Sequence, residues 1–491
     1  VKTHPDVMAG KKSGHFDLSV NRDRVRVIAD AVNPITLLEG VGRVYTGTSQ
    51  MGFEALMMGK QVVCFGAPFY AGWGLTDDRV AVPRRGRARS VEQVFAAAYI
   101  LYSRYVCPDS GRRGTIEEVV EHLALQRRYF DANPGSIHCL GFSRWKRNYV
   151  RAYLRCPGND IVFNTSSAQA LRRGFDEHAH LLVWGTRNGE DTERLATSHG
   201  TSVWRMEDGF LRSIGLGSDL TLPASLVIDR SGIYYDPSQP SDLEHLLQRE
   251  DRGPEVLERA AALRELIVST KLSKYNVDST KGVKLPDLKG RRVILVPGQV
   301  EDDASIRLGC VDIRTNTDLL KIVRQENPDA FVVYKPHPDV VSGNRTGNVP
   351  AASARAFADH VVREASIASC LDVADEVHTM TSLVGFEALL RGLKVTTYGR
   401  PFYASYGLTT DRHPMPRRRD NVTLDEMVAA ALIEYPRYIN ADTRAFTTPE
   451  FVVSNLVARR QQDAGRTSAK SSYLARRLRK LRNVVKGVFN V

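Results

Sequence analysis

The chain has 491 residues, a length that corresponds to about three domains of ~150 residues each. Its apolar fraction of 42% and charged fraction of 25% are ordinary for globular proteins, which excludes wholesale disorder, collagen and coiled coil. The six cysteines lie far apart, with no CxxC and no Cys/His cluster, so the sequence predicts neither a disulfide framework nor a zinc site and is typical of a reducing, cytosolic compartment. No apolar run approaches the ~20 residues of a membrane span, and the N-terminus lacks the pattern of a secretion signal.

An internal repeat begins at the first residues of the chain. Three blocks recur at a constant offset of 333 residues: 2–10 matches 335–343, 48–56 matches 381–389, and 68–85 matches 401–418. A period this long indicates a duplicated domain and not a solenoid. Because the first copy begins at residue 2 while a long unmatched stretch precedes the second, we expect this chain to be the C-terminal portion of a longer two-module protein.

The middle of the chain has the pattern of an α/β fold. Short apolar runs suited to buried strands occur at 180–184, 202–204, 224–229, 293–297, 330–334, 376–378 and 394–398. Stretches with helical spacing lie between them, around 319–323, 386–390 and 424–432. This alternation predicts doubly wound, Rossmann-like halves, with a polar linker at 279–290.

The predicted division of the chain has four parts. They are a C-terminal Rossmann-like half of a truncated first module (1–130), the acceptor-side half of a second module (136–285), its nucleotide-binding half (286–445) and a basic amphipathic tail (459–491). Ligands of such sheets bind at the carboxyl ends of the strands, so a site is expected in the cleft between the two halves.

The C-terminal tail concentrates the positive charge. Residues 459–491 contain ten Lys or Arg residues and one acidic residue, within a chain of formal net charge +12. Apolar residues recur there at helical spacing, namely Leu474, Leu478, Leu481, Val485 and Phe489. Such a helix suits an anionic membrane surface, and the alternative is a solvated helix docked on the protein itself. Nucleic acid is disfavoured because no stacking aromatic residues are interleaved with the charges.

Two acidic blocks follow predicted strands. In the first, Glu207 and Asp208 precede Arg212, so Asp208 can serve as nucleophile or base while Arg212 keeps it ionised or binds an anionic substrate. The second spans 299–303 and contains Asp302 and Asp303, oxygen ligands whose spacing is only weakly specific for a divalent metal. The structural alternative for both blocks is a helix N-terminus, where acids are favoured by the dipole.

Two further blocks carry groups suited to phosphate. Lys335 and His337 follow a predicted strand as a cation and an imidazole donor, although a loop histidine that merely caps a carbonyl is the alternative. Ser382 has the position of a helix N-cap, and free backbone N–H groups beside it form a phosphate site. Glu387 lies too far along for a capping box, so it is a candidate acceptor for ribose hydroxyls, against the alternative of an ordinary cap with an exposed Glu.

Together these motifs resemble the capsule polysaccharide biosynthesis family of KpsC type. The resemblance rests on the half repeat and on EDGFLRSIGLG, PGQVEDDAS, YKPHPDV, TSLVGFEALLRG and RPFYASYGLTTDR. It covers 140–440 as a complete module and 1–106 as the remainder of another. Members are cytoplasmic transferases that add β-linked 3-deoxy-D-manno-octulosonic acid (Kdo) during capsule assembly. The resemblance implies a GT-B-like fold with two Rossmann-like halves per module, CMP-β-Kdo as donor substrate, and a phosphatidylglycerol-linked poly-Kdo acceptor at the inner membrane.

The resemblance also implies roles for the acidic blocks. Asp208 corresponds to the catalytic carboxylate, with Glu207 beside it. The implied reaction is a retaining transfer through a covalent sugar adduct on Asp208, without a metal or other cofactor. Gln299 on the donor side, and Arg212 and Asp303 as sugar or acceptor contacts, are expected to line the cleft.

The donor site is implied by the remaining motifs. His337 and Ser382 correspond to the CMP phosphate site and Glu387 to the ribose contact, with Lys335 and Gly385 beside them.

The first module keeps only this nucleotide half, as Lys2, His4, Ser49 and Glu54. Nothing before these residues supplies an EDGF equivalent, so we expect that module to be inactive in this chain.

Two alternatives stay open at the level of the sequence. One is a GT-B transferase for another CMP-linked acidic sugar, such as a sialic acid, since cleft arginines serve either carboxylate. The other is a non-catalytic glycolipid-binding subunit that its basic tail recruits to the membrane as a peripheral protein.

Overall fold

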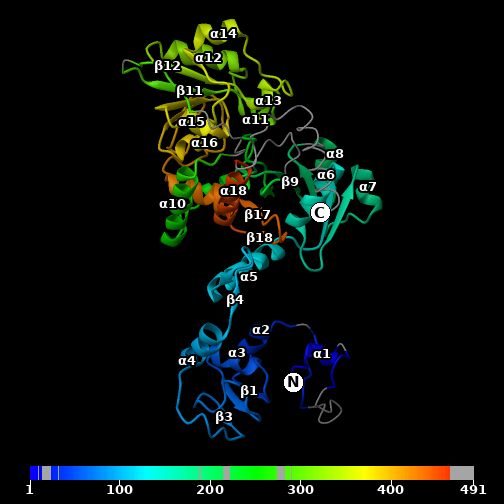
Figure 1. Cartoon of the computed structure of the whole chain (residues 1–491). Coiled ribbons are helices and arrows are strands. Elements are labelled where there is room, and N and C mark those ends of the chain that lie inside the picture. The colour runs from blue at the N-terminus through cyan, green and yellow to red at the C-terminus, as the bar shows by residue number, and fades with distance from the viewer. Residues whose placement is uncertain are drawn as a thin grey trace. The chain divides into compact units, whose positions relative to one another are not determined.

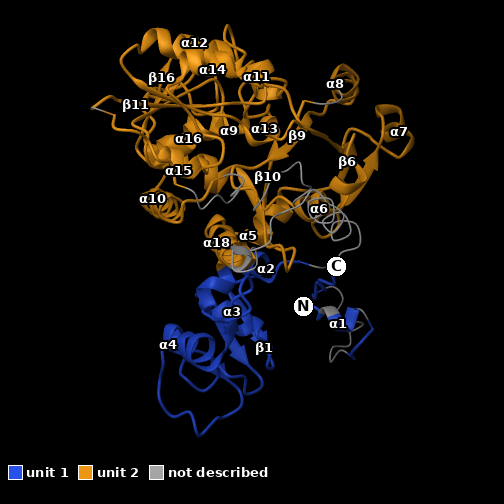
Figure 2. Cartoon of the chain, turned by 45° about the horizontal axis from the view of Figure 1, so that its top comes forward, with its two compact units in different colours: residues 1–120 blue, residues 121–491 orange. Residues whose placement is uncertain are grey.

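The computed structural model describes residues 1–8, 10–13, 24–30, 32–186, 189–213, 222–273, 282–288 and 290–464. The chain divides into two compact units, residues 1–120 and 121–491 (Figure 2). Most of the predicted basic tail, 465–491, lies outside the described residues. In the described part, no helix is long and apolar enough to cross a membrane.

Unit 2 contains a seven-stranded sheet in the order β18-β17-β10-β9-β8-β6-β7 (Figure 1). Its strands are β6 (Ser136–Leu140), β7 (Asp160–Asn164), β8 (His180–Trp184), β9 (Val203–Asp208), β10 (Ser225–Asp229), β17 (Pro436–Ile439) and β18 (Phe446–Thr447). Strands β6 to β9 run parallel, whereas β10 is antiparallel to β9 and to β17. Because β17 follows the second sheet along the chain, the polypeptide returns to the first sheet at its end.

The second sheet of unit 2 has six parallel strands in the order β13-β12-β11-β14-β15-β16. They are β11 (Val293–Pro297), β12 (Phe331–Lys335), β13 (His360–Val361), β14 (Glu376–Thr379), β15 (Lys394–Thr397) and β16 (Thr410–Asp411). This is the strand order of the Rossmann fold, which reverses direction between β11 and β14 and leaves a crevice at the carboxyl ends of the strands.

Helices connect the strands of both sheets. In unit 2 they are α6 (Arg144–Leu154), α7 (Ser167–Arg172), α8 (Gly189–Ser198), α9 (Asp242–Leu247), α10 (Pro254–Ser269), α11 (Ala304–Gly309), α12 (Asn316–Glu326), α13 (Pro338–Val341), α14 (Ala351–Phe357), α15 (Ile367–Leu371), α16 (Leu383–Leu389), α17 (Leu424–Val428), the π-helix η3 (Ala429–Glu434) and α18 (Pro449–Ala464). Helix α5 (Ile116–Asp131) spans the boundary between the units.

The predicted α/β class is confirmed, and several elements agree closely with the sequence pattern. Strands β8 and β11 have the predicted bounds, whereas β9 continues beyond the predicted 202–204 to Asp208. The helix predicted over 424–432 is α17 followed by the wider turn of η3. Strands β6 and β7 were not predicted; each is only five residues long and contains two polar residues, Ser136 and His138 in β6 and Asp160 and Asn164 in β7.

Unit 1 repeats most elements of unit 2 from α13 onward at the offset of 333 residues. Its elements are α1 (Pro5–Met8), α2 (Pro34–Glu39), β1 (Arg43–Thr46), α3 (Met51–Met57), β2 (Gln61–Cys64), β3 (Asp77–Asp78), α4 (Val91–Phe95), the π-helix η1 (Ala96–Tyr102), β4 (Tyr105–Val106) and β5 (Arg113–Gly114). Strands β1, β2 and β3 correspond to β14, β15 and β16, and η1 corresponds to η3. Helices α5 and α18 also correspond, so the structural repeat extends well past the last matching sequence block.

Packing in the repeated block explains its glycine and tyrosine. The Tyr403 hydroxyl donates to the Ser382 carbonyl at 2.5 Å, and a Cβ at Gly385 would lie 2.2 Å from that hydroxyl. In unit 1, Tyr70 donates to Ser49 at 2.5 Å over Gly52 in the same way. The glycine therefore lets the tyrosine clamp the turn that opens the following helix.

The two sheets of unit 2 are joined by a buried ion cluster. Glu244 of α9 accepts hydrogen bonds from Arg417 Nε at 2.5 Å and Arg418 Nε at 3.0 Å. Arg418 also donates to the carbonyls of Pro401 and Ala404. Burial raises the pKa of Glu244, but the hydrogen bonds and charges of the two arginines outweigh it and hold the pKa below its ordinary value.

The start of the predicted tail belongs to a docked helix. Arg459 and Arg460 lie in α18, where Arg459 pairs with Asp442 and Arg460 donates to the carbonyl of Thr270 at 2.7 Å. These first two cations of the predicted tail are therefore bound to the protein itself.

We expect Gly385→Ala and Gly52→Ala each to destabilise the unit that carries it by about 1–3 kcal/mol, because the added methyl group displaces the tyrosine. Hydrogen exchange followed by mass spectrometry measures the two units separately. Each variant is the control for the other, and equal loss of protection in both units from either variant would contradict this account of the packing.

Glu244→Gln is expected to lower the free energy of unfolding by about 3 kcal/mol at pH 7, because Arg418 stays buried without a charged partner. Since the folded pKa of Glu244 lies below its ordinary value of 4.5, this stabilisation is fully present above that pH. It is lost as pH falls through the folded pKa, so wild type and variant should converge in acid. Urea unfolding followed by fluorescence of Trp145, Trp184 and Trp204 measures the difference.

The matched control is Glu250→Gln, whose side chain is exposed and 3.8 Å from Arg419. It should change stability by less than about 0.5 kcal/mol. A pH-independent difference between Glu244→Gln and wild type would be evidence against the ion cluster.

Candidate active site

The end of β9 carries a paired carboxylate and arginine. Arg212 Nε donates to Asp208 Oδ2 at 2.6 Å, with only 5% of the arginine side chain and 20% of the aspartate side chain exposed. Asp208 Oδ1 is shielded from solvent and has no hydrogen-bond partner among the described residues. Arg212, predicted as a sugar or acceptor contact, is therefore paired with Asp208, and its Nη1 also donates to Ser213 Oγ at 3.2 Å.

The next two residues of this motif have structural roles. A Cβ at Gly209 would lie 2.3 Å from Ser225 Oγ, so only glycine permits the close approach of β10. Phe210 is buried and stacks on Phe402 with ring centroids 4.5 Å apart. The motif therefore joins the acidic pair directly to the second half of unit 2.

Two tyrosines that the sequence pattern did not indicate lie beside the acidic pair. Tyr235 is buried, which raises its pKa, and the charge of Glu207 raises it further. Tyr234 has its pKa raised by loss of solvation and then by nearby carboxylates, including Glu207, Asp208 and Asp303. Asp208 of the first half and Asp303 of the second half therefore both act on Tyr234.

The acidic residues after β11, at 301–303, mainly make structural contacts. Asp303 caps α11 through the Ser305 N–H at 3.0 Å, and Asp302 pairs with Arg345 at 3.1 Å. Glu301 accepts from the Asn316 N–H at 2.7 Å. Across the described ranges, no three His, Cys, Asp or Glu side chains gather as metal ligands.

Gln299 locks the loop that precedes Ser382. It is buried, its Oε1 accepts from the Thr381 N–H at 3.0 Å, and its Nε2 donates to Thr381 Oγ1 at 3.1 Å. Its backbone N–H donates to Asn316 Oδ1 at 2.8 Å. These bonds commit the Gln299 amide to positioning the loop.

The predicted helix cap is confirmed at the start of α16. Ser382 Oγ accepts from the Val384 N–H at 3.2 Å, while the Gly385 N–H is bonded to the Ser382 carbonyl. Glu387 is only 7% exposed, so the alternative of an ordinary exposed Glu is wrong. In unit 1, Ser49 Oγ likewise accepts from a helix N–H, but Glu54 is half-buried.

Lys335, the last residue of β12, and His337, two residues further on, have different roles. Lys335 is buried, and its Nζ donates to the Arg363 carbonyl at 3.2 Å. Burial lowers the pKa of Lys335. Lys2 of unit 1 donates to the Asp30 carbonyl, the equivalent position, at 2.9 Å. Because the contact is repeated, Lys335 has a structural role. The prediction had instead placed it with His337 as a pair that binds phosphate.

His337 caps α13 through its Nδ1, which accepts from the Asp339 N–H at 3.1 Å. His4 makes the same bond to Asp6 at 3.1 Å. The histidine therefore caps an N–H group, and the alternative of a carbonyl cap is wrong. Because Nδ1 accepts, the proton of the neutral ring lies on Nε2, which is suited to donate to an anion.

Arg400 is a further candidate that the sequence analysis missed. Its N–H donates to the Gly309 carbonyl at 2.7 Å, and its Nε is shielded without a bond to any described residue. A Cβ at Gly309 would lie 2.9 Å from Thr381 Cγ2 and 3.8 Å from the Tyr235 carbonyl, so both halves of unit 2 meet here. The signal was present in the repeat, where Ala67 takes the place of Arg400.

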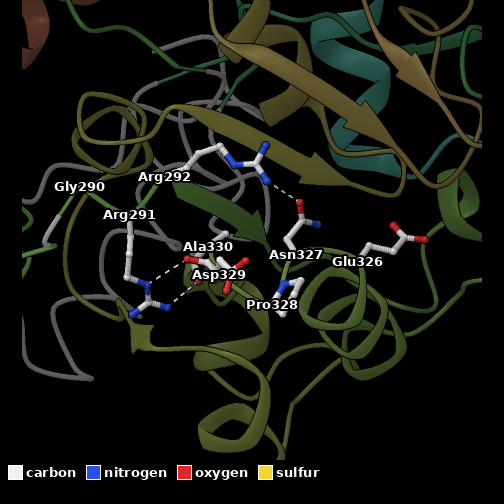
Figure 3. Close-up of a pocket in the computed structure, with 8 residues that line it drawn as sticks. All are labelled: Gly290, Arg291, Arg292, Glu326, Asn327, Pro328, Asp329 and Ala330. Atoms are coloured by element: carbon white, nitrogen blue, oxygen red, sulfur yellow. Dashed lines mark hydrogen bonds between the residues drawn. The ribbon is translucent and has the colours of Figure 1, made fainter.

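A hollow at the opposite end of the second sheet is not part of this site. Figure 3 shows it at the amino ends of β11 and β12, lined by 290–292 and 326–330. Arg291 and Arg292 donate there to the Ala330 carbonyl and to Asn327, at 2.7 Å and 2.6 Å. The two arginines of the hollow are therefore already bonded within the protein. Ligands of such sheets bind at the carboxyl ends of the strands, which is the opposite end.

Comparisons with known proteins identify the family of the chain. A model of the capsule polysaccharide biosynthesis protein family matches residues 1–105 and 179–438. The capsule polysaccharide modification protein LipA of Neisseria meningitidis serogroup B is 43% identical over 491 residues, which cover 99% of this chain and 69% of LipA. The lipopolysaccharide-processing protein LpsZ of Rhizobium meliloti is 41% identical over 308 residues, 61% of this chain and 69% of LpsZ.

Two solved structures are also similar, both of KpsC from Thermosulfurimonas dismutans. A β-Kdo 2,7 transferase is 38% identical with a TM-score of 0.54 and covers 66% of this chain and 99% of its own. A β-Kdo 2,4 transferase is 32% identical with a TM-score of 0.56 and covers 66% of this chain and 98% of its own. The chain therefore belongs to the capsule polysaccharide biosynthesis family and is related to the KpsC Kdo transferases.

Proposed function

We propose that unit 2 is a retaining glycosyltransferase that moves Kdo from CMP-β-Kdo to a phosphatidylglycerol-linked poly-Kdo acceptor. The observation that carries the proposal is the Asp208–Arg212 pair at the end of β9, with one carboxylate oxygen held by Arg212 and the other without a described partner. The relation to KpsC Kdo transferases supports the choice of sugar.

The proposed module is GT-B-like. Two α/β sheets with strand ends at a shared cleft, and a chain that returns to the first sheet at β17, support this assignment. Residues 136–285 form its acceptor-side half and 286–445 its nucleotide half, and the first half also takes strands β17 and β18.

Unit 1 is proposed to be the nucleotide half of another module. Tyr102 in unit 1 is 85% exposed, whereas its equivalent Tyr435 is 6% exposed and donates to Asp229 of the first half at 2.7 Å. No described part of the chain supplies unit 1 with an acidic pair like Glu207–Asp208, so we propose that it does not catalyse transfer.

The donor is proposed to bind at the carboxyl ends of the second sheet. His337 Nε2–H and the N-terminus of α16 at Ser382 would hold the CMP phosphate, and Glu387 would contact the ribose. Gly385 shapes this turn, while Lys335 and Gln299 keep its loops in position.

In the first proposed step, an Asp208 oxygen attacks the anomeric carbon of Kdo. The bond to the phosphate oxygen breaks with its electron pair, and CMP leaves as the anion. The sugar is then an ester of Asp208 with inverted configuration. Arg212 orients the carboxylate for this step through its bond to Asp208 Oδ2.

In the second step, an acceptor hydroxyl attacks the same carbon. Its proton passes to Glu207, the ester bond breaks, and Asp208 recovers its charge. Two inversions give net retention. Asp303 contributes from the opposite half as a proposed sugar contact.

The lipid-linked acceptor gives the predicted tail its proposed function. A basic amphipathic stretch in 459–491 would hold the protein on the anionic inner-membrane surface as a peripheral, cytoplasmic protein. Its structural basis lies outside the described residues beyond Ala464.

Asp208→Ala is expected to reduce Kdo transfer by at least about a thousandfold, since removal of a nucleophile eliminates the covalent route. The assay supplies CMP-β-Kdo generated in place and a synthetic Kdo-terminated lipid acceptor, and mass spectrometry measures the product.

Asp160→Asn is the matched control, because this exposed aspartate lies at the amino end of β7. It should retain activity. Full transfer by Asp208→Ala would refute the assigned role, and transfer from a CMP-sialic acid but not from CMP-β-Kdo would identify a different donor.

His337→Ala is expected to weaken CMP binding about tenfold, because it removes one hydrogen bond to a charged phosphate. Titration calorimetry measures the dissociation constant. His4→Ala removes the equivalent imidazole from unit 1 and should leave the unit 2 affinity unchanged. Equal affinity of wild type and His337→Ala would exclude the imidazole from the phosphate site.

A further inference from the structure

Helix α6 carries an unusual basic face in the first half of unit 2. The helix has no acid in its first turn, and its exposed or half-buried cations are Arg144, Lys146, Arg147 and Arg151, followed by Arg155 at its C-cap. Arg144, Arg147, Arg151 and Arg155 follow one another at intervals of three or four, so they share a face. Tyr149, Val150 and Tyr153 are buried on the opposite face.

Aromatic rings and strand ends hold these cations in place. Arg147 Nε donates to the Phe142 carbonyl, just after β6, at 3.0 Å. The guanidinium groups of Arg147 and Arg151 lie 5.5 Å and 4.9 Å from the ring centroid of Phe163 near the end of β7. The amine of Lys146 lies 3.0 Å from the ring centroid of Trp184, the last residue of β8.

This basic face lies at the same end of the sheet as Asp208. In the sheet, β9 is followed by β8, β6 and β7, and Asp208 is the last residue of β9. Three spacings of about 4.8 Å between strands separate β7 from β9 by roughly 14 Å. The buried Tyr149 of α6 connects the two places, since burial and then the charge of Asp208 raise its pKa.

The charges are unfavourable for the isolated fold. No described carboxylate pairs with Arg144, Arg147 or Arg151. Arg144, the first residue of the helix, also opposes the dipole, at a cost of about 0.3–1 kcal/mol, whereas Arg151 lies in the last turn, where the dipole favours a cation. The carbonyl and ring contacts of Arg147 and Arg151 position these cations without neutralising their charge, so the face is suited to bind an anion.

We propose that the face formed by Arg144, Arg147 and Arg151 binds the carboxylates of the acceptor oligosaccharide behind its terminal sugar. This inference rests on the proposed function, which supplies an acceptor with one carboxylate per Kdo. The terminal hydroxyl lies at Asp208, and the preceding sugars extend across β8 and β6 toward β7. The donor phosphate is excluded as the occupant because its proposed site lies on the other sheet, at His337 and Ser382.

The double variant Arg144→Gln/Arg151→Gln tests the inference without disturbing the Arg147 bond to the backbone. For a synthetic acceptor with three Kdo residues, KM should rise at least tenfold, while kcat and the affinity for CMP change less than twofold. Calorimetry without donor should give the same loss of acceptor affinity. The same acceptor with its carboxyl groups reduced should bind wild type and variant equally.

The matched control is Arg127→Gln/Arg172→Gln, which removes two exposed charges from α5 and α7, away from the basic face of α6. Its acceptor KM should change less than twofold. Unchanged acceptor binding by Arg144→Gln/Arg151→Gln, or an equal loss in the control, would overturn the inference and leave the proposed transferase intact. Wild type that binds the carboxylated acceptor through these arginines but transfers no Kdo would support the inference and refute the proposed function.

Discussion

The contact between Phe210 and Phe402 is the interaction on which the candidate site depends. Phe210 lies two residues after Asp208, and its ring is buried against the second half of unit 2. The acidic pair of one sheet is therefore fixed by a side chain that packs on the other. Glu244 with Arg417 and Arg418, and Asp229 with Tyr435, add two more buried links between the halves. Interfaces of this kind leave little freedom for one half to move relative to the other near Asp208.

The repeat separates residues that hold the fold from residues that carry chemistry. Four residues of the repeated motifs make the same contacts in both units, as a structural role predicts. The equivalent pairs are Lys2 and Lys335, Gly52 and Gly385, Tyr70 and Tyr403, and Arg85 and Arg418. Other positions differ: Glu387 is buried whereas Glu54 is half-buried, and Arg400 is replaced by Ala67. Glu387 and Arg400 are therefore candidates for ligand contacts that are specific to unit 2.

The sequence predicted local features well, but it did not predict side-chain contacts between residues far apart in the chain. The buried runs of β8 and β11 and the N-cap at Ser382 depend on short-range patterns, and the structure confirms them. The partner of Lys335 was not predictable, because its amine bonds to a carbonyl 28 residues away. Gln299 is similar, since its partner Thr381 lies 82 residues further along. Tyr234 and Tyr235 were missed because a Tyr-Tyr pair has no motif, and only the folded chain brings it to Glu207.

The buried position of Arg212 has a consequence for the proposed mechanism. Before the proposed attack, Asp208 is held in a largely buried ion pair with Arg212, of whose side chain 5% is exposed. Formation of the proposed sugar ester would remove the charge of Asp208 and with it this ion pair. The loss of one partner of a buried ion pair costs about 3–5 kcal/mol. This cost raises the free energy of the adduct relative to the product state, in which the carboxylate returns. In the proposed mechanism the ion pair therefore makes the first step less favourable and the second step more favourable, because it makes the ester a better donor to the acceptor hydroxyl.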